Sequence, residues 1–156
     1  MKTMEPTRPA PECACRVSLT AGPAAAAEAR RQVQAIIRTW DVPVDEADAV
    51  LLTSELVTNA ITHVAGRTIW LAITCGEDQF RVDVQDSSFA MPAPQTGPAD
   101  AETGRGLMLV ASLSAEWGYY PAPSGKAVYF ALAYRAGADL DGASGQGGRR
   151  DRSWVR

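Results

Sequence analysis

The segment LLTSELVTNAITHV, residues 51–64, decides the fold because its pattern predicts one amphipathic helix. Glu55 and Asn59 lie four residues apart on one side of that helix. With successive residues about 100° apart, an apolar stripe forms nearly opposite this pair, from Val50, Val57, Ile61 and Val64. The segment therefore predicts a helix that buries one face and presents a carboxylate and an amide on the other.

The ends of this helix are marked in the sequence as well. Asp45 lies where an N-cap is expected, and Asp48 follows three residues later as an acidic version of the capping box. Gly66 suits the position just after the last helical turn. We therefore expect a helix over residues 46–65.

The pair formed by Glu55 and Asn59 has two interpretations. An acid and an amide on adjacent turns are commonly part of a solvated surface. Here three leucines border the pair and would be unfavourable in open water, namely Leu51, Leu52 and Leu56. The pair is therefore interpreted as the polar floor of a partly covered pocket, where oxygen ligands suit a hard cation such as magnesium.

Composition limits the classes of protein that the chain can belong to. Its 156 residues, 46% of them hydrophobic, suit one compact globular domain. No apolar run approaches the roughly 18 residues of a membrane span, and residues 1–20 lack the apolar block of a signal peptide. A net charge of −3 and a pI near 5.1 provide no basic surface for nucleic acid. We expect a cytoplasmic protein that binds neither membranes nor nucleic acid directly.

The cysteines and the single histidine are weak signals. Three cysteines, an odd number, fit a reducing compartment better than a disulfide framework. Cys13 and Cys15 form a C-x-C pair that could bind a metal, but no second pair or nearby histidine supports it. His63 is interpreted as a helix residue near the rim of the pocket rather than as part of a catalytic triad.

The first half of the chain predicts a strand, a helix and a hairpin. Residues 15–19 alternate as a short edge strand, and a helix is predicted from Pro23, with apolar residues at helical spacing up to Trp40. Residues 68–75 and 80–85 alternate and are joined by a turn over residues 76–78. On the second of these strands, three polar residues are expected to face water: Arg81, Asp83 and Gln85.

The second half begins with a long segment that has no periodicity. Residues 89–103 read FAMPAPQTGPADAET, and a loop of this length is usually functional or disordered. A helix is predicted to follow Gly104-Arg105-Gly106, with its inward face made by Leu107, Val110, Ala111 and Leu113. Glycines at a helix N-terminus let backbone N–H groups approach an anion, although G-x-G is equally common as turn chemistry. A last hairpin is predicted from residues 116–120 and 127–134.

Three regions are expected along the chain. Residues 1–14 are rich in proline and predict a disordered lead-in. Residues 15–135 form the single folded domain. Residues 136–156 are rich in glycine, mixed in charge, and predict a flexible tail.

Read in order, these pieces resemble a known family. The E-x-x-x-N helix, the hairpin ending at Asp86, the G-x-G helix start and the closing Gly125-Lys126 are similar to the Bergerat-type ATP-binding domain of gyrase, histidine kinases and anti-sigma-factor serine kinases. ELVTNAITH, ETGRGLMLV and GKAVYFAL most resemble small stand-alone proteins of actinobacterial type. The resemblance covers about residues 16–134. It implies an α/β (α+β) two-layer sandwich, with three helices on one face of a mixed, mainly antiparallel sheet.

The resemblance also implies roles for individual residues. Glu55 matches the acid that orients a water or accepts a hydroxyl proton, and Asn59 matches a magnesium ligand. Asp86 matches the aspartate that accepts a hydrogen bond from the adenine amino group. Gly104, Arg105 and Gly106 match the second glycine box around the phosphates of ATP. Further nucleotide contacts are implied for His63, Ser88, Met91, Thr103 and Leu107.

The chain departs from the family pattern in ways that predict modest ATP affinity. Ser87 and Ser88 follow Asp86, where the family usually has D-x-G. Ala127 stands where a threonine often helps to hold the adenine. The loss of that hydroxyl removes one hydrogen bond, which contributes about 0.5–1.5 kcal/mol.

The function that the resemblance implies is that of an ATP- and Mg²⁺-dependent serine/threonine protein kinase of the anti-sigma-factor type. Such a protein would bind a sigma factor or similar regulator and phosphorylate a small antagonist protein. No helix pair with a phosphorylatable histidine precedes the domain, so a full histidine kinase fits less well. Two alternatives stay open: a nucleotide-binding module without catalysis, and an interaction domain that has lost nucleotide. A homodimer through the sheet edge or the first helix is a further expectation.

Overall fold

The computed structural model describes residues 12–62, 67–88, 108–123 and 125–135. The two long helices are α1 (Ala25–Trp40) and α2 (Glu46–Ile61), and residues 108–113 are also helical. The strands are β1 (Cys13–Thr20), β2 (Thr68–Cys75), β3 (Gln79–Asp86), β4 (Glu116–Ala122) and β5 (Gly125–Ala133). They form one sheet in the order β1-β2-β3-β5-β4.

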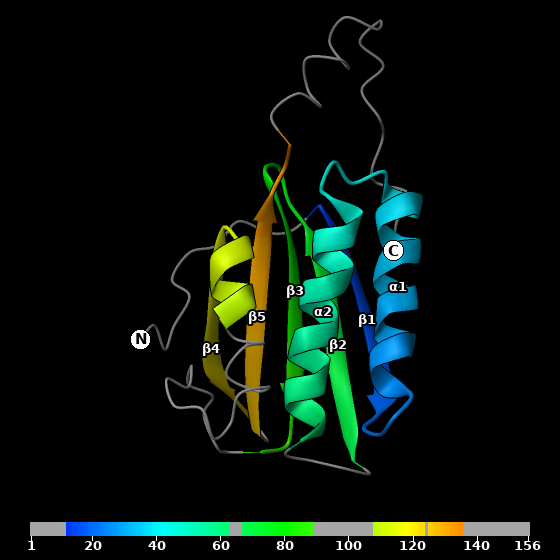
Figure 1. Cartoon of the computed structure of the whole chain (residues 1–156), viewed down its shortest axis with the longest axis vertical. Helices are drawn as coiled ribbons and strands as arrows, with labels where there is room; N and C mark the ends of the chain where they lie inside the picture. The colour runs from blue at the N-terminus through cyan, green and yellow to red at the C-terminus, as the bar shows by residue number, and fades with distance from the viewer. Residues whose placement is uncertain (1–11, 63–66, 89–107, 124, 136–156) are drawn as a thin grey trace, which may run out of the picture.

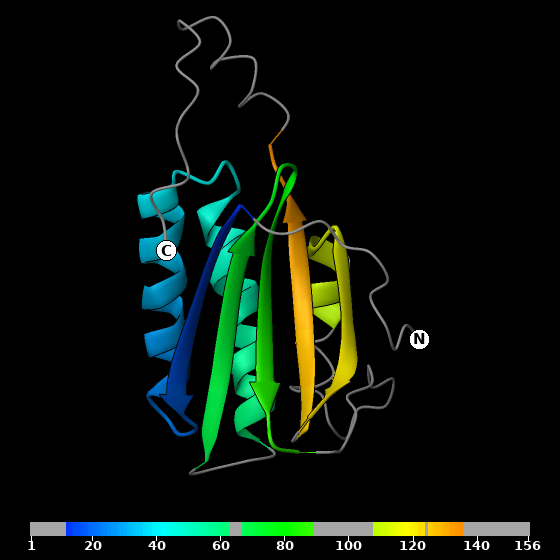
Figure 2. The ribbon, with the colours of Figure 1, turned by 180° about the vertical axis from the view of Figure 1, so that it is seen from behind.

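The helices lie on one face of this sheet, and the view from behind shows the other face (Figures 1 and 2). This arrangement confirms the predicted two-layer sandwich. Each pair of neighbouring strands is antiparallel, so the described sheet is wholly antiparallel rather than mixed. No helix in the described ranges combines the length and the apolar character needed to cross a membrane.

The α1 helix begins two residues later than predicted. Pro23 lies in the preceding turn, and the first helical residue is Ala25. The helix ends at Trp40, and the next residue, Asp41, adopts the left-handed conformation with φ 55°. That conformation reverses the chain direction after α1. A short connection therefore brings α2 back antiparallel against α1.

The α2 helix begins as predicted but exposes a different face. The Asp45 carboxylate accepts a hydrogen bond from the Asp48 backbone N–H at 3.0 Å, which confirms the N-cap. The helix ends at Ile61, and residues 63–66 lie outside the described ranges. The predicted apolar stripe was correct at Val57, which is fully buried, whereas Val50 and Ile61 are only half-buried and Val64 lies outside the described ranges. The α2 helix packs on α1 as well as on the sheet, so its buried face is wider and is centred on Ala49, Leu52, Leu56, Val57 and Ala60.

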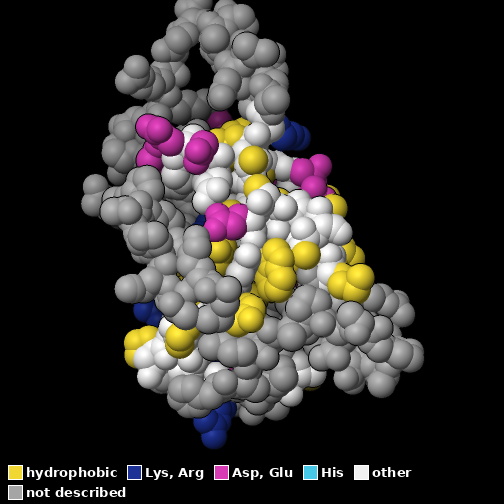
Figure 3. All heavy atoms as spheres, turned by 90° about the vertical axis from the view of Figure 1, so that its left-hand side faces the viewer, with side chains coloured by type: hydrophobic (Ala, Val, Ile, Leu, Met, Phe, Trp, Pro, Cys, Tyr) yellow, Lys and Arg dark blue, Asp and Glu magenta, His cyan; other side chains and the backbone are white. Residues whose placement is uncertain are grey.

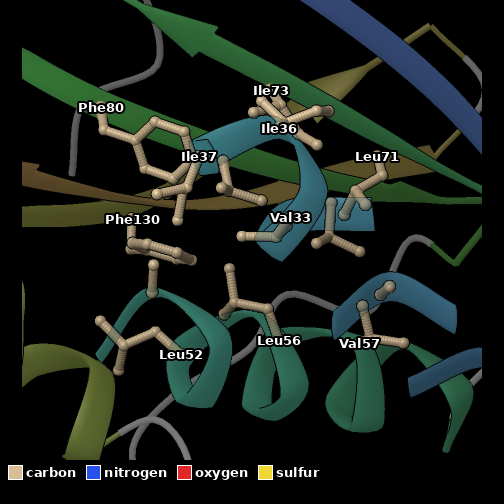
Figure 4. Packing of buried hydrophobic residues seen from close by; sticks show 14 of the residues in the cluster. Val33, Ile36, Ile37, Leu52, Leu56, Val57, Leu71, Ile73, Phe80 and Phe130 are labelled. Atoms are coloured by element: carbon tan, nitrogen blue, oxygen red, sulfur yellow. The ribbon is translucent and has the colours of Figure 1, made fainter. Parts of the chain in front are cut away.

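The core lies between the two layers (Figure 4). Phe80 and Val82 of β3, predicted to be buried, are fully buried there. Phe130 of β5 packs in the same layer and faces Leu52 and Leu56 of α2. Full burial of one aliphatic or aromatic side chain of this size contributes about 1.5–3 kcal/mol relative to its exposure. This packing fixes α2 against the centre of the sheet.

The face of the sheet opposite the helices, called the outer face below, is less open to water than predicted. Arg81 and Asp83 were expected to face water, yet their exposed fractions are 3% and 8%. The Arg81 guanidinium donates two hydrogen bonds to the Asp83 carboxylate, at 2.8 and 2.9 Å, and lies 3.7 Å from the centre of the Tyr129 ring. The Tyr120 hydroxyl donates to Asp83 at 2.6 Å. Tyrosines from β4 and β5 therefore cover this ion pair, which alternation along a single strand does not reveal.

The segment after the long loop buries less than predicted. Within residues 108–113, Val110 is fully buried, whereas Ala111 and Leu113 are exposed. The expected inward positions of these two residues were therefore wrong. Leu107 lies outside the described ranges.

The last hairpin is longer and its turn tighter than predicted. The β4 strand extends to Ala122 and β5 already begins at Gly125.

Figure 3 views the molecule from the β4 side, where hydrophobic and acidic side chains are interspersed with isolated basic ones.

Candidate functional site

The α2 helix positions Glu55 and Asn59 on its flank. Asn59 is buried, with an exposed fraction of 7%, and Glu55 one turn earlier is half-buried. Within the part of the chain that the structure describes, neither side chain forms a hydrogen bond or an ion pair. The Thr62 hydroxyl donates to the Asn59 backbone carbonyl at 2.6 Å, and this bond does not involve the side-chain amide. Both side chains therefore have oxygen atoms available for a ligand.

Asp86 ends β3 and lies on the helix-facing side of the sheet, in phase with Val82 and Val84. In the register between β3 and β5, its partner is Lys126. The Lys126 ammonium donates to both Asp86 carboxylate oxygens, at 2.8 and 3.1 Å. Both side chains are almost completely buried. The Ser88 backbone N–H adds a third hydrogen bond to the carboxylate, at 2.8 Å.

Two neighbouring residues complete this end of the sheet. A Cβ atom added to Gly125 would lie 1.9 Å from the Asp86 carbonyl oxygen, so only glycine permits the close approach of β5 to β3 here. The Ser87 hydroxyl oxygen is buried and has no hydrogen-bond partner among the described residues. A buried hydroxyl without a partner is costly unless a ligand or water satisfies it. Its position beside Asp86 is consistent with a ligand site.

These residues belong to one end of the molecule. The α2 helix runs toward the end at which β3 finishes and β5 begins (Figures 1 and 2). Asn59 therefore lies at the same end as Asp86 and Lys126. Seven other predicted nucleotide contacts lie outside the described residues: His63, Met91, Thr103, Gly104, Arg105, Gly106 and Leu107.

Sequence reasoning used Lys126 only as part of the closing Gly125-Lys126 motif and missed its ion pair with Asp86. Ala127 is opposite Gln85 in the register, and alternation turns its side chain to the outer face. Lys126 instead shares the core phase with Val128 and Phe130. A lysine in phase with buried apolar residues was the signal that could have revealed a buried ion pair, because such a charge is rarely buried without a partner.

Comparison with protein families decides the identity of the domain. The family model of the histidine kinase-like ATPase domain matches residues 19–132, which is most of the chain. The chain belongs to this family. No curated protein matches the chain well enough to count as a relative. As a histidine kinase-like ATPase domain, the protein has an ATP-binding fold, and family membership implies nucleotide binding, typically with Mg²⁺.

The residues present fit this ligand. Within the described ranges, no group of three or more His, Cys, Asp or Glu side chains could hold a metal ion. Mg²⁺ commonly uses one or two protein ligands together with substrate phosphates and water. The uncommitted amide oxygen of Asn59 suits that mode of binding. The Asp86 carboxylate has about four acceptor positions, and described residues occupy three of them.

Proposed function

We propose that this protein is an ATP- and Mg²⁺-dependent serine/threonine protein kinase of the anti-sigma-factor type. It would bind a sigma factor or a similar transcription regulator and phosphorylate a small antagonist protein. The proposal is supported by the family of the domain together with one geometric observation. Among the described residues, Glu55 and Asn59 have no side-chain partner on the flank of α2, and Asn59 lies at the end of the molecule where Asp86 closes β3.

Each of these residues has a separate part in the proposed reaction. Mg²⁺ would neutralise charge on the phosphates, and Asn59 would supply an oxygen ligand to it. The Glu55 carboxylate would accept the proton of the target hydroxyl as a general base. Asp86 would orient the adenine by accepting a hydrogen bond from its amino group.

Nucleotide binding is tested first, by calorimetric titration of ATP with and without Mg²⁺. Asn59→Ala should weaken the Mg²⁺-dependent part of the affinity, while the exposed neighbour Thr58→Ala on the same helix serves as the matched control. We expect a loss of about tenfold or more for Asn59→Ala, since one metal ligand is removed. Equal affinity of Asn59→Ala and Thr58→Ala in the presence of Mg²⁺ would remove the assignment of Asn59.

Catalysis is tested with labelled ATP and a small antagonist protein that the chain binds. Phosphate should reach a serine or threonine of that protein, and Glu55→Gln should reduce the rate by about 10²–10⁴-fold while leaving ATP affinity near that of the wild type. Transfer that is unaffected by Glu55→Gln would remove Glu55 from the proposed role.

A second candidate function is a nucleotide-binding module that binds a partner protein without catalysis. The departures from the family pattern at Ser88 and Ala127 favour it, because both are expected to weaken the binding of the adenine. Binding of ATP without transfer to any partner that the chain retains would support this candidate.

A further inference from the structure

The Asp86 carboxylate has a fixed and nearly saturated set of hydrogen bonds. Lys126 occupies one position on each oxygen, and the Ser88 backbone N–H occupies a second position on Oδ1. A carboxylate offers about two positions on each oxygen. Among the described residues, this leaves one acceptor position unoccupied, on Oδ2.

Lys126 also fixes the chemical character of that remaining position. A carboxylate whose two oxygens both accept hydrogen bonds from an ammonium group is held as a hydrogen-bond acceptor. Its free position can only accept a hydrogen bond. The ammonium also prevents rotation of the carboxylate, because both oxygens are held by the same nitrogen atom at 2.8 and 3.1 Å.

The surroundings leave the pair no alternative arrangement. Lys126 has an exposed fraction of 0%, and its position in β5 is set by the register that places it opposite Asp86. The backbone of Gly125 packs against the Asp86 carbonyl at a distance that no other residue permits. Asp86 and Lys126 are thus held as one rigid unit.

We infer that Lys126 is a positioning residue for base recognition, which makes the single free acceptor of Asp86 specific for a purine with an amino group at position 6. The inference rests on the proposed nucleotide site. An amino group donates one hydrogen bond to the free position, whereas a purine with hydrogen at position 6 leaves that position unsatisfied. Without Lys126, the carboxylate is free to turn away or to bind water, and the two bases are distinguished less well.

The test compares ATP with purine riboside triphosphate, which lacks the 6-amino group, by calorimetric titration in the presence of Mg²⁺. The wild type should prefer ATP by about 10- to 100-fold, the range for a hydrogen bond to a charged group. Lys126→Met should lower this preference toward equality. A merely structural role would reduce both affinities by the same factor and leave the preference unchanged.

The matched control is Arg81→Met, which removes the cation of the buried ion pair on the outer face of the same β3 strand. It should lower stability and keep the preference for ATP. Lys126→Gln retains an N–H donor near Asp86 and replaces Lys126→Met if that variant fails to fold. The preference of Lys126→Gln for ATP over purine riboside triphosphate should be smaller than that of the wild type but not abolished.

The wild-type protein offers an independent readout. The chain has two lysines, Lys2 and Lys126, so ¹⁵N labelling of the lysine side chains yields few ammonium signals in an NMR spectrum. A Lys2→Arg variant identifies the signal of Lys126. ATP should shift the Lys126 signal, and saturating purine riboside triphosphate should shift it less. Equal shifts, or an unchanged preference in both Lys126 variants, would overturn the inference. Absence of ATP binding by the wild type would instead overturn the proposed nucleotide site itself.

Discussion

Gly125 and Asp86 approach so closely that a Cβ on Gly125 would lie 1.9 Å from the Asp86 carbonyl oxygen and 2.7 Å from the Ser87 Cα. Both obstacles are backbone atoms, which cannot rotate away as a side chain can. The start of β5 therefore depends on glycine for its position against the end of β3.

Gly125→Ala should destabilise the fold by about 1–3 kcal/mol or more, since overpacking against backbone forces the strands apart. Urea unfolding followed by circular dichroism measures this change. Gly76→Ala is the matched control, because a Cβ at Gly76 meets nothing within 4 Å. Equal unfolding free energies for the two variants would show that β5 shifts without cost.

Lys126→Met should destabilise the protein by about 3–5 kcal/mol, because it leaves the Asp86 carboxylate buried without its counter-charge. The double variant Lys126→Met with Asp86→Asn removes both charges and should recover part of that loss. Chemical denaturation of the two single variants and the double variant yields the coupling energy. Strictly additive effects would contradict a direct interaction.

Tyr120→Phe should reveal a pH-dependent contribution on the outer face. Burial, and then the Asp83 charge, raise the pKa of Tyr120 above its usual value in the folded protein. The phenol therefore contributes fully to the free energy of unfolding at a pH below about 10, the pKa of tyrosine in the unfolded chain. This contribution is lost as the pH rises above that value.

Below about pH 9, the wild type should exceed Tyr120→Phe in unfolding free energy by about 1 kcal/mol, because the half-buried hydroxyl donates to a carboxylate. Denaturation at a series of pH values up to about 11 should show this difference narrowing. A difference that grows with pH in this range would reverse the assigned direction of the pKa shift.

Thr53→Val should stabilise the protein by about 1 kcal/mol. Among the described residues, the Thr53 hydroxyl oxygen is buried and has no hydrogen-bond partner. Valine has nearly the same shape and does not bury an unsatisfied polar atom. Thermal unfolding compares Thr53→Val with Thr58→Val, an exposed site on the same helix, where the change should be small.

The strands of the central hairpin were predictable from the sequence because their alternation is strong. Phe80, Val82 and Val84 are buried as expected, and the Asp45 cap of α2 was equally clear. These features depend on residues that are close in the sequence. The family resemblance supplied the arrangement of the layers.

The errors arose where the outcome depends on partners far along the chain. Burial of Arg81 and Asp83 depends on tyrosines of β4 and β5, and no pattern within β3 contains that information. The role of Lys126 depends on the register between β3 and β5, which alternation alone does not fix. In the sequence of a single strand, an exposed charged residue cannot be distinguished from a member of a buried ion pair until the neighbouring strand is known.

The position of β5 in the sheet has a consequence for synthesis on the ribosome. The β5 strand is the last in the sequence but lies between β3 and β4, and it supplies Lys126 to Asp86. A nascent chain that has emerged only as far as β4 therefore exposes the unpaired edge of β3, and β4 has no partner strand. The Asp86 carboxylate also lacks its cation, Lys126. Translation must carry the chain past residue 133 before the sheet can close, so the hazard of aggregation is concentrated in that interval.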